Sequence, residues 1–201
     1  MFTKKIKSWI KRYLDYKRFK RKAYKSRSYV TKPLKIRNQK YIKLGSNVKL
    51  YENARIECYD SFNQKILSPS LIIGDNVIIN NNFTALIADE CTIGDNTIIA
   101  HNVSIINENH GVDINLGLPF SSQSLSTKPI SIGKNCWIGC NAVFVPGSSV
   151  GDNCVVGAGA VVNKSFPPNS MIVGVPAKRI KEYDTEQGIW IPLKNERKES
   201  I

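Results

Sequence analysis

The sequence contains few residues that bind metals or cross-link a chain, and no long apolar run. It has two histidines and five cysteines among 201 residues, with no Cys-x-x-Cys pair. A zinc site needs convergent His or Cys ligands at short spacing, so we expect no metal centre. No apolar stretch approaches a membrane span of roughly 20 residues or the core of a signal peptide. We therefore expect a cytoplasmic protein whose cysteines stay reduced.

Acidic residues are almost absent from the first 40 positions. Residues 1–40 hold sixteen Lys and Arg against one acid, Asp15, whereas the other 161 residues carry a net charge of −2. The net charge of +13 for the whole chain therefore belongs to its N-terminal part. We divide the chain into a basic arm (1–40), a body (41–180) and a polar tail (181–201).

The arm places apolar residues at helical spacing, with lysine and arginine between them. These apolar residues are Phe2, Ile6, Trp9, Ile10, Tyr13 and Leu14. The pattern predicts a basic amphipathic helix. Three interpretations stay open: peripheral binding of residues 1–28 to an anionic membrane, packing on the body or on a partner subunit, and nucleic-acid binding. No nucleic-acid recognition module accompanies the charge, which makes the last of these the weakest.

The body is organised by a six-residue repeat, which is clearest from Ile132 to Phe166. Every sixth residue is Ile, Val or Phe, and the residue after it is often Gly. The fifth position is small until Phe166 ends the series, being occupied by Cys136, Ala142, Ser148, Cys154 and Ala160. Neither the helical period nor strand alternation gives this pattern. A fixed short repeat predicts a parallel β-helix, an all-β fold whose flat sides each bury one large aliphatic and one small residue.

Three of the cysteines fall at the small position of the repeat. Cys136 and Cys154 are eighteen residues apart, which is three blocks, so they are expected to stack on adjacent coils. Cys91 has the same place in an earlier block. Free cysteine is among the most buried residue types, and we interpret all three as core residues.

The repeat begins weakly at Tyr41 and is interrupted twice. The polar stretch from Glu57 to Ser70 predicts a loop that leaves the coil. The second interruption, Asn107 to Pro129, is longer, because the 27 residues from Ile105 to Ile132 are not a multiple of six. A loop of this length in a compact repeat domain is usually functional.

His110 lies at the start of the longer loop. Imidazole has a near-neutral unperturbed pKa, so it suits the removal of a proton from a hydroxyl group. His101, in contrast, occupies an outward turn position of a regular block and is interpreted as a surface or groove residue.

Several motifs occur in a fixed order along the body: Asn-Glu-Asn-His-Gly in the loop, then Trp-Ile-Gly, Ala-Gly-Ala-Val-Val and Gly-Val-Pro-Ala-Lys. In this combination the chain resembles the hexapeptide-repeat acyltransferases, chiefly the maltose and galactoside O-acetyltransferases and related capsule and exopolysaccharide enzymes. The similarity covers Leu71 to Ile180, with a weaker extension to Tyr41. It implies a left-handed parallel β-helix with an extruded loop, a homotrimer with active sites between subunits, acetyl-CoA as co-substrate and a saccharide acceptor.

The resemblance also implies roles for single residues. His110 falls on the catalytic base, and the acceptor is expected to contact Asn80, Asn82 and Asn107; Asn80 would otherwise belong to a turn-side asparagine ladder. Acetyl-CoA is expected to lie along Trp137, Cys140, Ala142, Gly159, Ala160, Asn163, Lys164, Lys178 and Arg179. The family often has Ser where this chain has Cys140, so an acetyl-cysteine route stands beside direct transfer. The group that orients His110 is left open between Asn107, Glu108 and a main-chain carbonyl.

These inferences combine into one expected function. We expect an acetyl-CoA-dependent O-acetyltransferase that acts on a sugar hydroxyl in cell-surface polysaccharide biosynthesis, in the cytoplasm and peripherally on the inner face of the plasma membrane. The alternatives are acetylation of a free sugar or an antibiotic in solution, and a non-catalytic β-helical scaffold. A carbonic anhydrase of this fold would need three histidines on zinc, which two histidines exclude.

Overall fold

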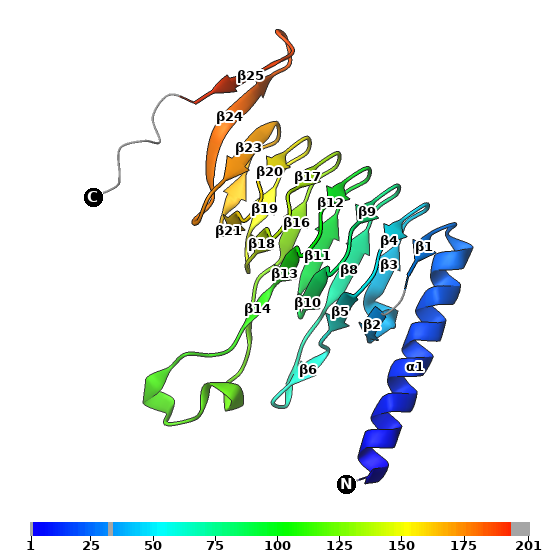
Figure 1. The fold of residues 1–201 in the computed structure, drawn as a ribbon. Helices are drawn as coiled ribbons and strands as arrows, with labels where there is room; N and C mark the ends of the chain where they lie inside the picture. Colours follow the sequence, from blue (N-terminus) through cyan, green and yellow to red (C-terminus); the bar gives the residue numbers. More distant parts are fainter. Residues whose placement is uncertain (1, 32–33, 194–201) are drawn as a thin grey trace.

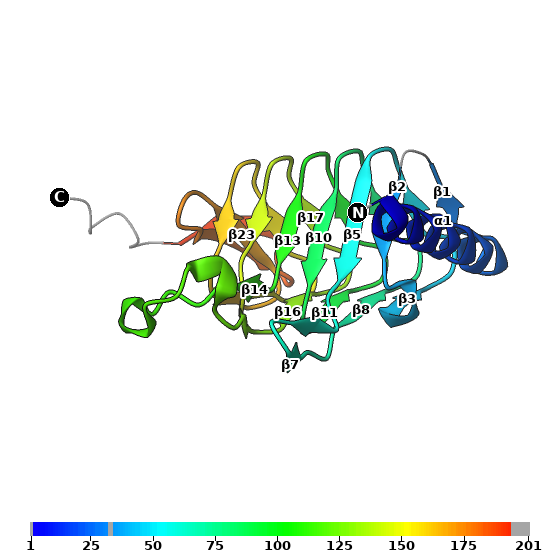
Figure 2. The same cartoon turned by 90° about the horizontal axis from the view of Figure 1, so that it is seen from below.

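The chain forms one helix followed by a stack of coils (Figures 1 and 2). The computed structural model describes residues 2–31 and 34–193, and the side chains of residues 2–9, 11, 12 and 34 lie outside that description. Each coil places one short strand in each of three sheets, so three flat sides enclose the core. The stack runs from α1 at one end to the β24–β25 hairpin at the other.

Two of the sheets have six strands and one has nine. Sheet A contains, in spatial order, β1 (Tyr29–Val30), β4 (Lys49–Leu50), β9 (Ile78–Ile79), β12 (Ile98–Ile99), β17 (Trp137–Ile138), β20 (Val155–Val156), β23 (Ser170–Val173), β24 (Lys178–Asp184) and β25 (Ile189–Pro192). Sheet B contains β2 (Leu34–Arg37), β5 (Ala54–Cys58), β10 (Thr84–Ile87), β13 (Ser104–Ile106), β18 (Val143–Phe144) and β21 (Val161–Val162).

Sheet C contains β3 (Ile42–Leu44), β8 (Ser70–Ile73), β11 (Glu90–Ile93), β16 (Ile130–Ile132), β19 (Ser149–Val150) and β22 (Ser165–Phe166). Two antiparallel pairs lie outside the coils: β6 (Ser61–Phe62) with β7 (Lys65–Ile66), and β14 (Glu108–Asn109) with β15 (Ser126–Thr127). The 3-10 turns are η1 (Gln39–Tyr41), η2 (Ile114–Leu116) and η3 (Phe120–Ser122). Within sheets A to C the strands are parallel except at β24 and β25.

The six-residue pattern maps onto the core as the sequence predicted. The large residues of the repeat that are at most 2% exposed are Ile132, Ile138, Phe144, Val150, Val156 and Val162. The small positions are equally buried, and Cys91, Cys136 and Cys154 belong to the same core cluster. Burying each large aliphatic side chain stabilises the fold by about 1.5–3 kcal/mol, so a regular repeat produces one continuous core.

Glycine at the second position of the repeat is explained by the close approach of successive coils. A Cβ atom built on Gly94 would lie 2.5 Å from the carbonyl carbon of Gly133 on the next coil. The backbone of Gly133 cannot move aside as the end of a flexible side chain could. A larger residue there would therefore push neighbouring coils apart.

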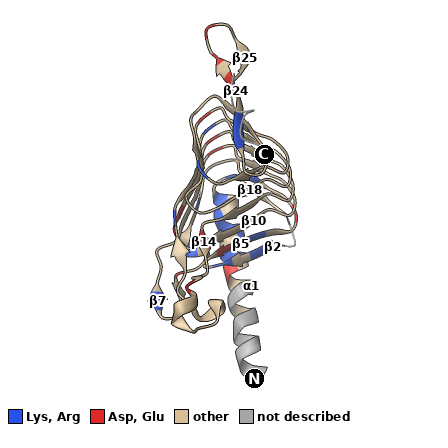
Figure 3. Ribbon diagram, turned by 90° about the vertical axis from the view of Figure 1, so that its left-hand side faces the viewer, with Lys and Arg blue, Asp and Glu red and all other residues tan. Residues whose placement is uncertain are grey.

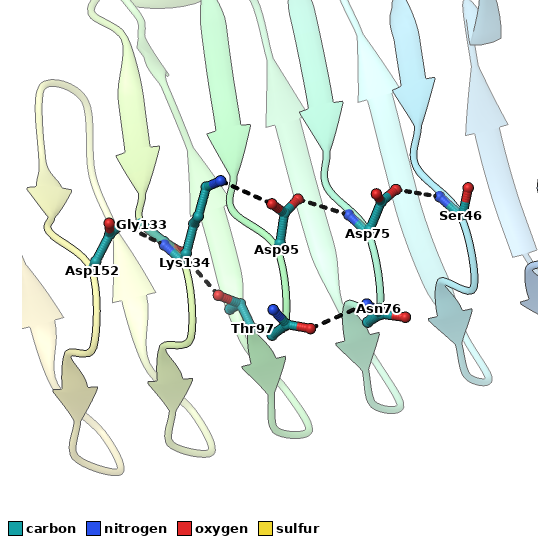
Figure 4. A network of polar contacts seen from close by, with 9 residues as sticks. Ser46, Asp75, Asn76, Asp95, Thr97, Gly133, Lys134 and Asp152 are labelled. Atoms are coloured by element: carbon teal, nitrogen blue, oxygen red, sulfur yellow. Dashed lines mark hydrogen bonds and ion pairs between the residues drawn. The ribbon is translucent and has the colours of Figure 1, made fainter.

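Polar side chains repeat along the edge where the chain passes from sheet C to sheet A (Figure 4). Asp95 Oδ1 accepts a hydrogen bond from Asp75 N at 2.9 Å, and Asn76 Nδ2 donates to Asn96 Oδ1 at 3.1 Å. Asn76 has φ of 57°, a left-handed conformation that asparagine tolerates better than most residues. The Gly-x-Asn sequence at this edge, which reads Gly-Asp-Asn at 74–76, 94–96 and 151–153, is thus the turn between sheets C and A, and its side chains join successive coils by hydrogen bonds.

The first coil begins earlier than Tyr41, the position from which the sequence showed a repeat. β1 already pairs with β4 and β2 with β5, so residues 29–30 and 34–37 belong to the coils, and the helical part of the arm ends at Lys25. These first strands lack the Gly-Asp-Asn turn, and β2 carries Lys35 and Arg37 on its outer face. For these reasons the coil was not recognisable from the repeat.

Helix α1 (Phe2–Lys25) covers the open N-terminal end of the core. Phe19 and Ala23 are buried against the coils, and Asp15, the one acid of the arm, accepts a hydrogen bond from Asn38 N at 3.3 Å. Ile10, Tyr13 and Leu14, from the expected apolar face, are 44–45% exposed and so lie away from the coils. The side chains of Phe2, Ile6 and Trp9 lie outside the described residues. No helix in the described ranges is long and apolar enough to cross a membrane.

At the opposite end of the stack, the segment expected to be a polar tail extends sheet A. β24 pairs with β23, and β25 pairs with β24, both antiparallel. The change of direction ends the stack, because an antiparallel strand cannot continue the coil path. Residues 194–201 of the tail lie outside the described residues.

Candidate active site

Both interruptions of the repeat leave the coils at the same edge, between sheets B and C, which we call the B–C edge. The β6–β7 hairpin connects β5 to β8, and the longer loop connects β13 to β16. Between these two levels, β10 passes directly to β11 through the short turn at Ala88 and Asp89. Figure 3 shows the two loops projecting together from one side of the molecule.

The first loop starts two residues later than expected, because Glu57 and Cys58 belong to strand β5. Glu57 is only 4% exposed and forms ion pairs with Lys35 at 2.5 Å and with Arg55 at 2.6 Å. Burial alone would raise the pKa of Glu57, but hydrogen bonds from Lys35 and Arg55 outweigh burial and lower it. A polar residue with such partners can remain within a strand. The start of the loop was therefore predicted too early, because the prediction relied on the polarity of Glu57.

Asn107 fixes the root of the longer loop. Its Oδ1 accepts hydrogen bonds from Ala88 N at 2.7 Å and Asp89 N at 3.3 Å, and its Nδ2 donates to Glu90 O at 3.2 Å. The side chain is fully buried. The interpretation of Asn107 as an acceptor ligand, or as the group that orients His110, is therefore wrong: its amide holds the turn of the coil below.

The longer loop is folded around one side chain, Gln123. This buried amide accepts from Asp113 N at 3.0 Å and donates to Asp113 O at 2.9 Å and Leu118 O at 3.1 Å. The loop thereby turns its apolar side chains outward, and those that are 52–79% exposed are Val112, Ile114, Leu116, Leu118 and Phe120. We call residues 112–120 the loop tip.

The two loops contact one another, and His110 takes part in that contact. The ring of Phe62, on β6, meets the His110 imidazole edge to face, with centroids 5.2 Å apart and planes at 74°. Asn63 Nδ2 donates to Ser121 O at 3.2 Å and Gln123 O at 3.3 Å, and Lys65 Nζ donates to Leu125 O at 3.1 Å. His110 itself is exposed at the end of β14.

The other expected site residues lie on a different edge, between sheets A and B, which we call the A–B edge. Asn80, Cys140 and Gly159 occupy turns there, after β9, β17 and β20, and the turn of His101 after β12 lies between those of Asn80 and Cys140. Gly159 N donates to Cys140 O at 2.8 Å, and Asn141 N donates to His101 O at 3.1 Å, which stacks the turns of Cys140 and His101. Trp137 is beside this edge on sheet A and is 59% exposed.

Cys140 is the cysteine that reaches the surface of the coil. The other four thiols are buried, and burial raises the pKa of Cys58 and Cys91 to about 12, which keeps them protonated. Within residues 2–31 and 34–193, no hydrogen bond is recorded for the main-chain N–H of Cys140. This donor is therefore available to an oxygen placed outside the turn.

Several residues expected to line a groove do not offer their side chains to one. Ala142 and Ala160 point into the core at 0% exposure, so they can line a ligand only through their backbone. Asn82 is a member of an asparagine ladder and donates to Asn102 Oδ1 at 2.8 Å. Arg179 forms an ion pair with Glu182 at 3.1 Å, so one face of its guanidinium is already occupied.

The three remaining candidates are exposed but divided between locations. Asn163 and Lys164 follow β21, at the B–C edge, and Lys164 Nζ lies 5.4 Å from the ring centroid of Phe166. Lys178 begins β24, on sheet A. Asn80 combines a hydrogen bond from its Nδ2 to Ile99 O at 3.0 Å with partial exposure. Among the described residues no group of three His, Cys, Asp or Glu side chains is placed to hold a metal ion.

The expected site residues therefore fall into two groups at different edges of one chain, which we call half-sites. His110, Asn163 and Lys164 lie at the B–C edge, whereas Asn80, Trp137 and Cys140 lie at or beside the A–B edge. The width of sheet B separates the two edges. A strand advances about 3.3 Å per residue, so a four-residue side is roughly 13 Å across, well beyond hydrogen-bonding reach.

Comparison with known proteins identifies the family to which this architecture belongs. Residues 129–164 match the model of the hexapeptide repeat of succinyl-transferase. The chain is 33% identical to WbbJ of Escherichia coli K12, provisionally named a lipopolysaccharide biosynthesis O-acetyl transferase, over 83% of this chain and 85% of that protein. It is 34% identical to the galactoside O-acetyltransferase of the same organism, over 66% and 63%.

A solved structure agrees with these sequence relationships. A maltose O-acetyltransferase from Clostridium difficile 630 superposes with a TM-score of 0.60 at 33% identity, covering 72% of this chain and 71% of that one. The chain thus belongs to the hexapeptide-repeat acetyltransferases, with their left-handed parallel β-helix, and is an acyltransferase of the O-acetyltransferase class. The expected family, fold and enzyme class are confirmed.

Sequence reasoning missed the residues that join the two loops: Phe62, Asn63, Lys65 and Gln123. One local signal existed, because Asn63 and Gln64 both adopt positive φ between two short strands, and an Asn at such a position marks a tight hairpin turn. Nothing in the sequence indicated which segment that hairpin would contact.

The structure predicts that Asn107→Ala acts on stability. Removing the amide leaves two buried N–H groups and one carbonyl without their partner, at about 1–3 kcal/mol for an unsatisfied buried group. We expect urea unfolding to show a loss in this range, with the KM for the acceptor changed less than twofold. Asn109→Ala, two residues along on exposed β14, is the matched control and should unfold like the wild type. A stable Asn107→Ala variant with a raised acceptor KM would return Asn107 to the acceptor site.

Proposed function

We propose that this protein transfers an acetyl group from acetyl-CoA to a hydroxyl of a sugar, with His110 as general base and with active sites between subunits of a homotrimer. The observation that carries the proposal is the division of the site into half-sites on two edges of one chain. Acetyl-CoA is the acetyl donor. A galactoside acetyltransferase 39% identical to this chain has been solved in complex with coenzyme A, over 58% of this chain and 57% of that one at a TM-score of 0.53.

The half-sites suit a direct transfer reaction. The imidazole of His110 accepts the hydroxyl proton while the acceptor oxygen forms a bond to the thioester carbonyl carbon. The resulting oxyanion accepts a hydrogen bond from the N–H of Cys140, a fixed donor of a kind worth about 3–4 kcal/mol. Collapse of the intermediate breaks the carbon–sulfur bond, and the departing thiolate of CoA takes the proton from the imidazolium.

Direct transfer is preferred to an acetyl-cysteine intermediate. A thiol nucleophile needs an adjacent base or a lowered pKa. The turn of His101 stacks on that of Cys140, but no hydrogen bond between their side chains is recorded among the described residues. His110 lies at the other edge of sheet B, so within one chain it is out of reach of the Cys140 thiol.

The trimer places the B–C edge of one subunit beside the A–B edge of the next. In a ring of identical subunits, one edge contacts a different edge of the neighbour, and each interface then contains both half-sites. The loop tip supports this arrangement because it exposes five large apolar side chains, and sheet A exposes Ile98 and Trp137 in register. Apolar patches of this kind usually mark protein contacts. Trp137 and Gly159 are then placed for the pantetheine arm, and Lys164 and Lys178 for the phosphates.

The acceptor is a saccharide of the cell surface, acetylated on the cytoplasmic side of the membrane. The provisional assignment of WbbJ to lipopolysaccharide biosynthesis supports this acceptor class over a free sugar or an antibiotic. The five free cysteines fit a reducing compartment. Surface saccharides are commonly assembled on lipid carriers, so the enzyme would work close to a membrane.

The outer face of α1 supplies a means of approach to that membrane. Its described part exposes Ile10 and Leu14 together with the cations Lys17, Arg18, Lys20 and Arg21. Apolar residues flanked by cations on a helix favour the surface of an anionic bilayer. Phe19 and Ala23, on the other face of α1, are buried against the core. The helix can therefore cover the end of the coils while its outer face contacts a membrane.

Substitution of His110 tests the catalytic assignment. His110→Ala and His110→Gln should lower kcat by roughly 10²–10⁴ because the general base is lost, with the KM for acetyl-CoA unchanged within about twofold. The measurement is CoA release against a panel of oligosaccharides, nucleotide sugars and free sugars, with Asn109→Ala as control. Unchanged turnover in His110→Ala would remove His110 from the mechanism.

Mixed trimers test whether the site lies between subunits. His110→Ala and Trp137→Ala damage different half-sites, so denaturing an equal mixture and refolding it together should restore interfaces in which both residues are intact. Random assembly into cyclic trimers gives such an interface about one time in four, so activity should return to about a quarter of the wild-type value at low acetyl-CoA. Activity no higher than that of the separate variants would place the whole site within one chain.

Vesicle binding tests the role of the helix. Replacing Lys17 and Lys20 by Gln should weaken binding to phosphatidylglycerol vesicles by roughly 30-fold, at about 1 kcal/mol per charge. The matched control replaces Lys43 and Lys49, which are exposed on the coils, and should leave binding unchanged. Co-sedimentation measures both. Binding that is absent in the wild type, or equal for the two double variants, would contradict the membrane proposal.

A further inference from the structure

The β6–β7 hairpin has no role in the transfer reaction described above, yet it contacts the longer loop at several points. Because this loop carries His110, we call it the catalytic loop below. In the described part of the chain no hydrogen bond involves the His110 imidazole, and the recorded contact of that ring is with Phe62 at 5.2 Å. An edge-to-face pair at this separation restricts the tilt of both rings. A general base works only when its nitrogen lies within hydrogen-bonding reach of the reacting proton.

The hairpin is itself firmly rooted. Leu67 at its end packs with Ala88 and Leu125, and Phe62 packs against this small cluster. These three residues come from three successive levels of the B–C edge. Asp60, at the base of the hairpin, accepts hydrogen bonds from Asn38 Nδ2 at 3.2 Å and Tyr41 Oη at 3.2 Å, which ties it to the first coil.

The hairpin also holds the far part of the catalytic loop. Asn63 and Lys65 donate to main-chain carbonyls of residues 121, 123 and 125, which immediately precede β15. Gln123, whose carbonyl is one of these acceptors, is the side chain around which the loop folds. The hairpin therefore contacts the loop at two places. One is His110, just after β14, and the other is residues 121–125, just before β15.

We propose that the β6–β7 hairpin is a brace for the catalytic loop and that Phe62 is the residue that positions the His110 imidazole. The proposal rests on the assignment of His110 as general base. It identifies Phe62 as the group that orients the His110 imidazole. Phe62 is a positioning residue, since it acts through His110 and takes no proton. Ile66, on the same hairpin, is 84% exposed and has no part in the contact.

Two substitutions of Phe62 separate its ring from its bulk. Phe62→Leu keeps an apolar side chain against Leu67 and Leu125 but removes the ring, whereas Phe62→Tyr keeps the ring. A misplaced base should lower kcat about tenfold to a hundredfold in Phe62→Leu, with the KM for acetyl-CoA within twofold of wild type. Phe62→Tyr should recover kcat to within about threefold, and Ile66→Ala should match the wild type. Loss of kcat in Phe62→Tyr as large as in Phe62→Leu would overturn the proposal.

A second measurement does not depend on activity. The chain has two histidines, so ¹³C-labelled imidazoles give two sets of signals, with His101 as internal reference. The ring current of Phe62 should shift the His110 signals, and Phe62→Leu should remove that shift while leaving His101 unchanged. Unmoved His110 signals in folded Phe62→Leu would sink the positioning role. If these signals move but His110→Ala remains active, the brace stands and the assignment of His110 as base fails.

Asn63→Ala tests the second contact of the brace. Without the Asn63 amide, the carbonyls of Ser121 and Gln123 lose their donor, and amide hydrogen exchange in residues 111–125 should speed up at least fivefold. Exchange in the coils, for example in β18, should stay as in the wild type. Unchanged exchange in the loop would show that the hairpin does not hold it.

Discussion

The constraint on which this structure depends is the in-register stacking of coils. Each strand forms its hydrogen bonds with the equivalent strands of the levels on either side, so every coil must follow the same three-sided path. The close approach at Gly94 and the left-handed turn at Asn76 are consequences of that requirement. A segment that does not follow the six-residue repeat must therefore leave the stack of coils at an edge and rejoin it at that edge.

This constraint determines where chemistry can be placed. The flat sides of the coils are occupied by short strands, and the inward positions are filled by core residues such as Ala142 and Cys154. Reactive groups are therefore confined to edges and to segments that leave them. His110 is on such a segment, and the free N–H of Cys140 is at a turn. Because these lie on different edges of the same stack of coils, the proposed assembly uses a second copy of the chain to bring them together.

The longer loop shows how a segment outside the repeat can still be well defined. It has no regular core of its own, and the apolar side chains of its tip are exposed. Its shape comes from Asn107 at the root, Gln123 inside it and the β6–β7 hairpin beside it. Two interruptions of the repeat that look independent in the sequence are thus one structural unit, since they leave the same edge two levels apart.

The sequence by itself determined the β-helix, its core positions and the presence of a protruding loop that contains His110. Those features follow from local spacing: a six-residue period fixes which side chains face inward, and a segment out of phase must protrude. The first coil was not recognised because its strands lack the turn signature. Glu57 was placed in a loop because its ion pair with Lys35 comes from the neighbouring strand β2, which is distant in the sequence. The part played by Asn107 and the pairing of Phe62 with His110 were decided only by the tertiary structure. Each depends on which residues of other coils lie beside it, and six-residue spacing carries no information about neighbours across an edge.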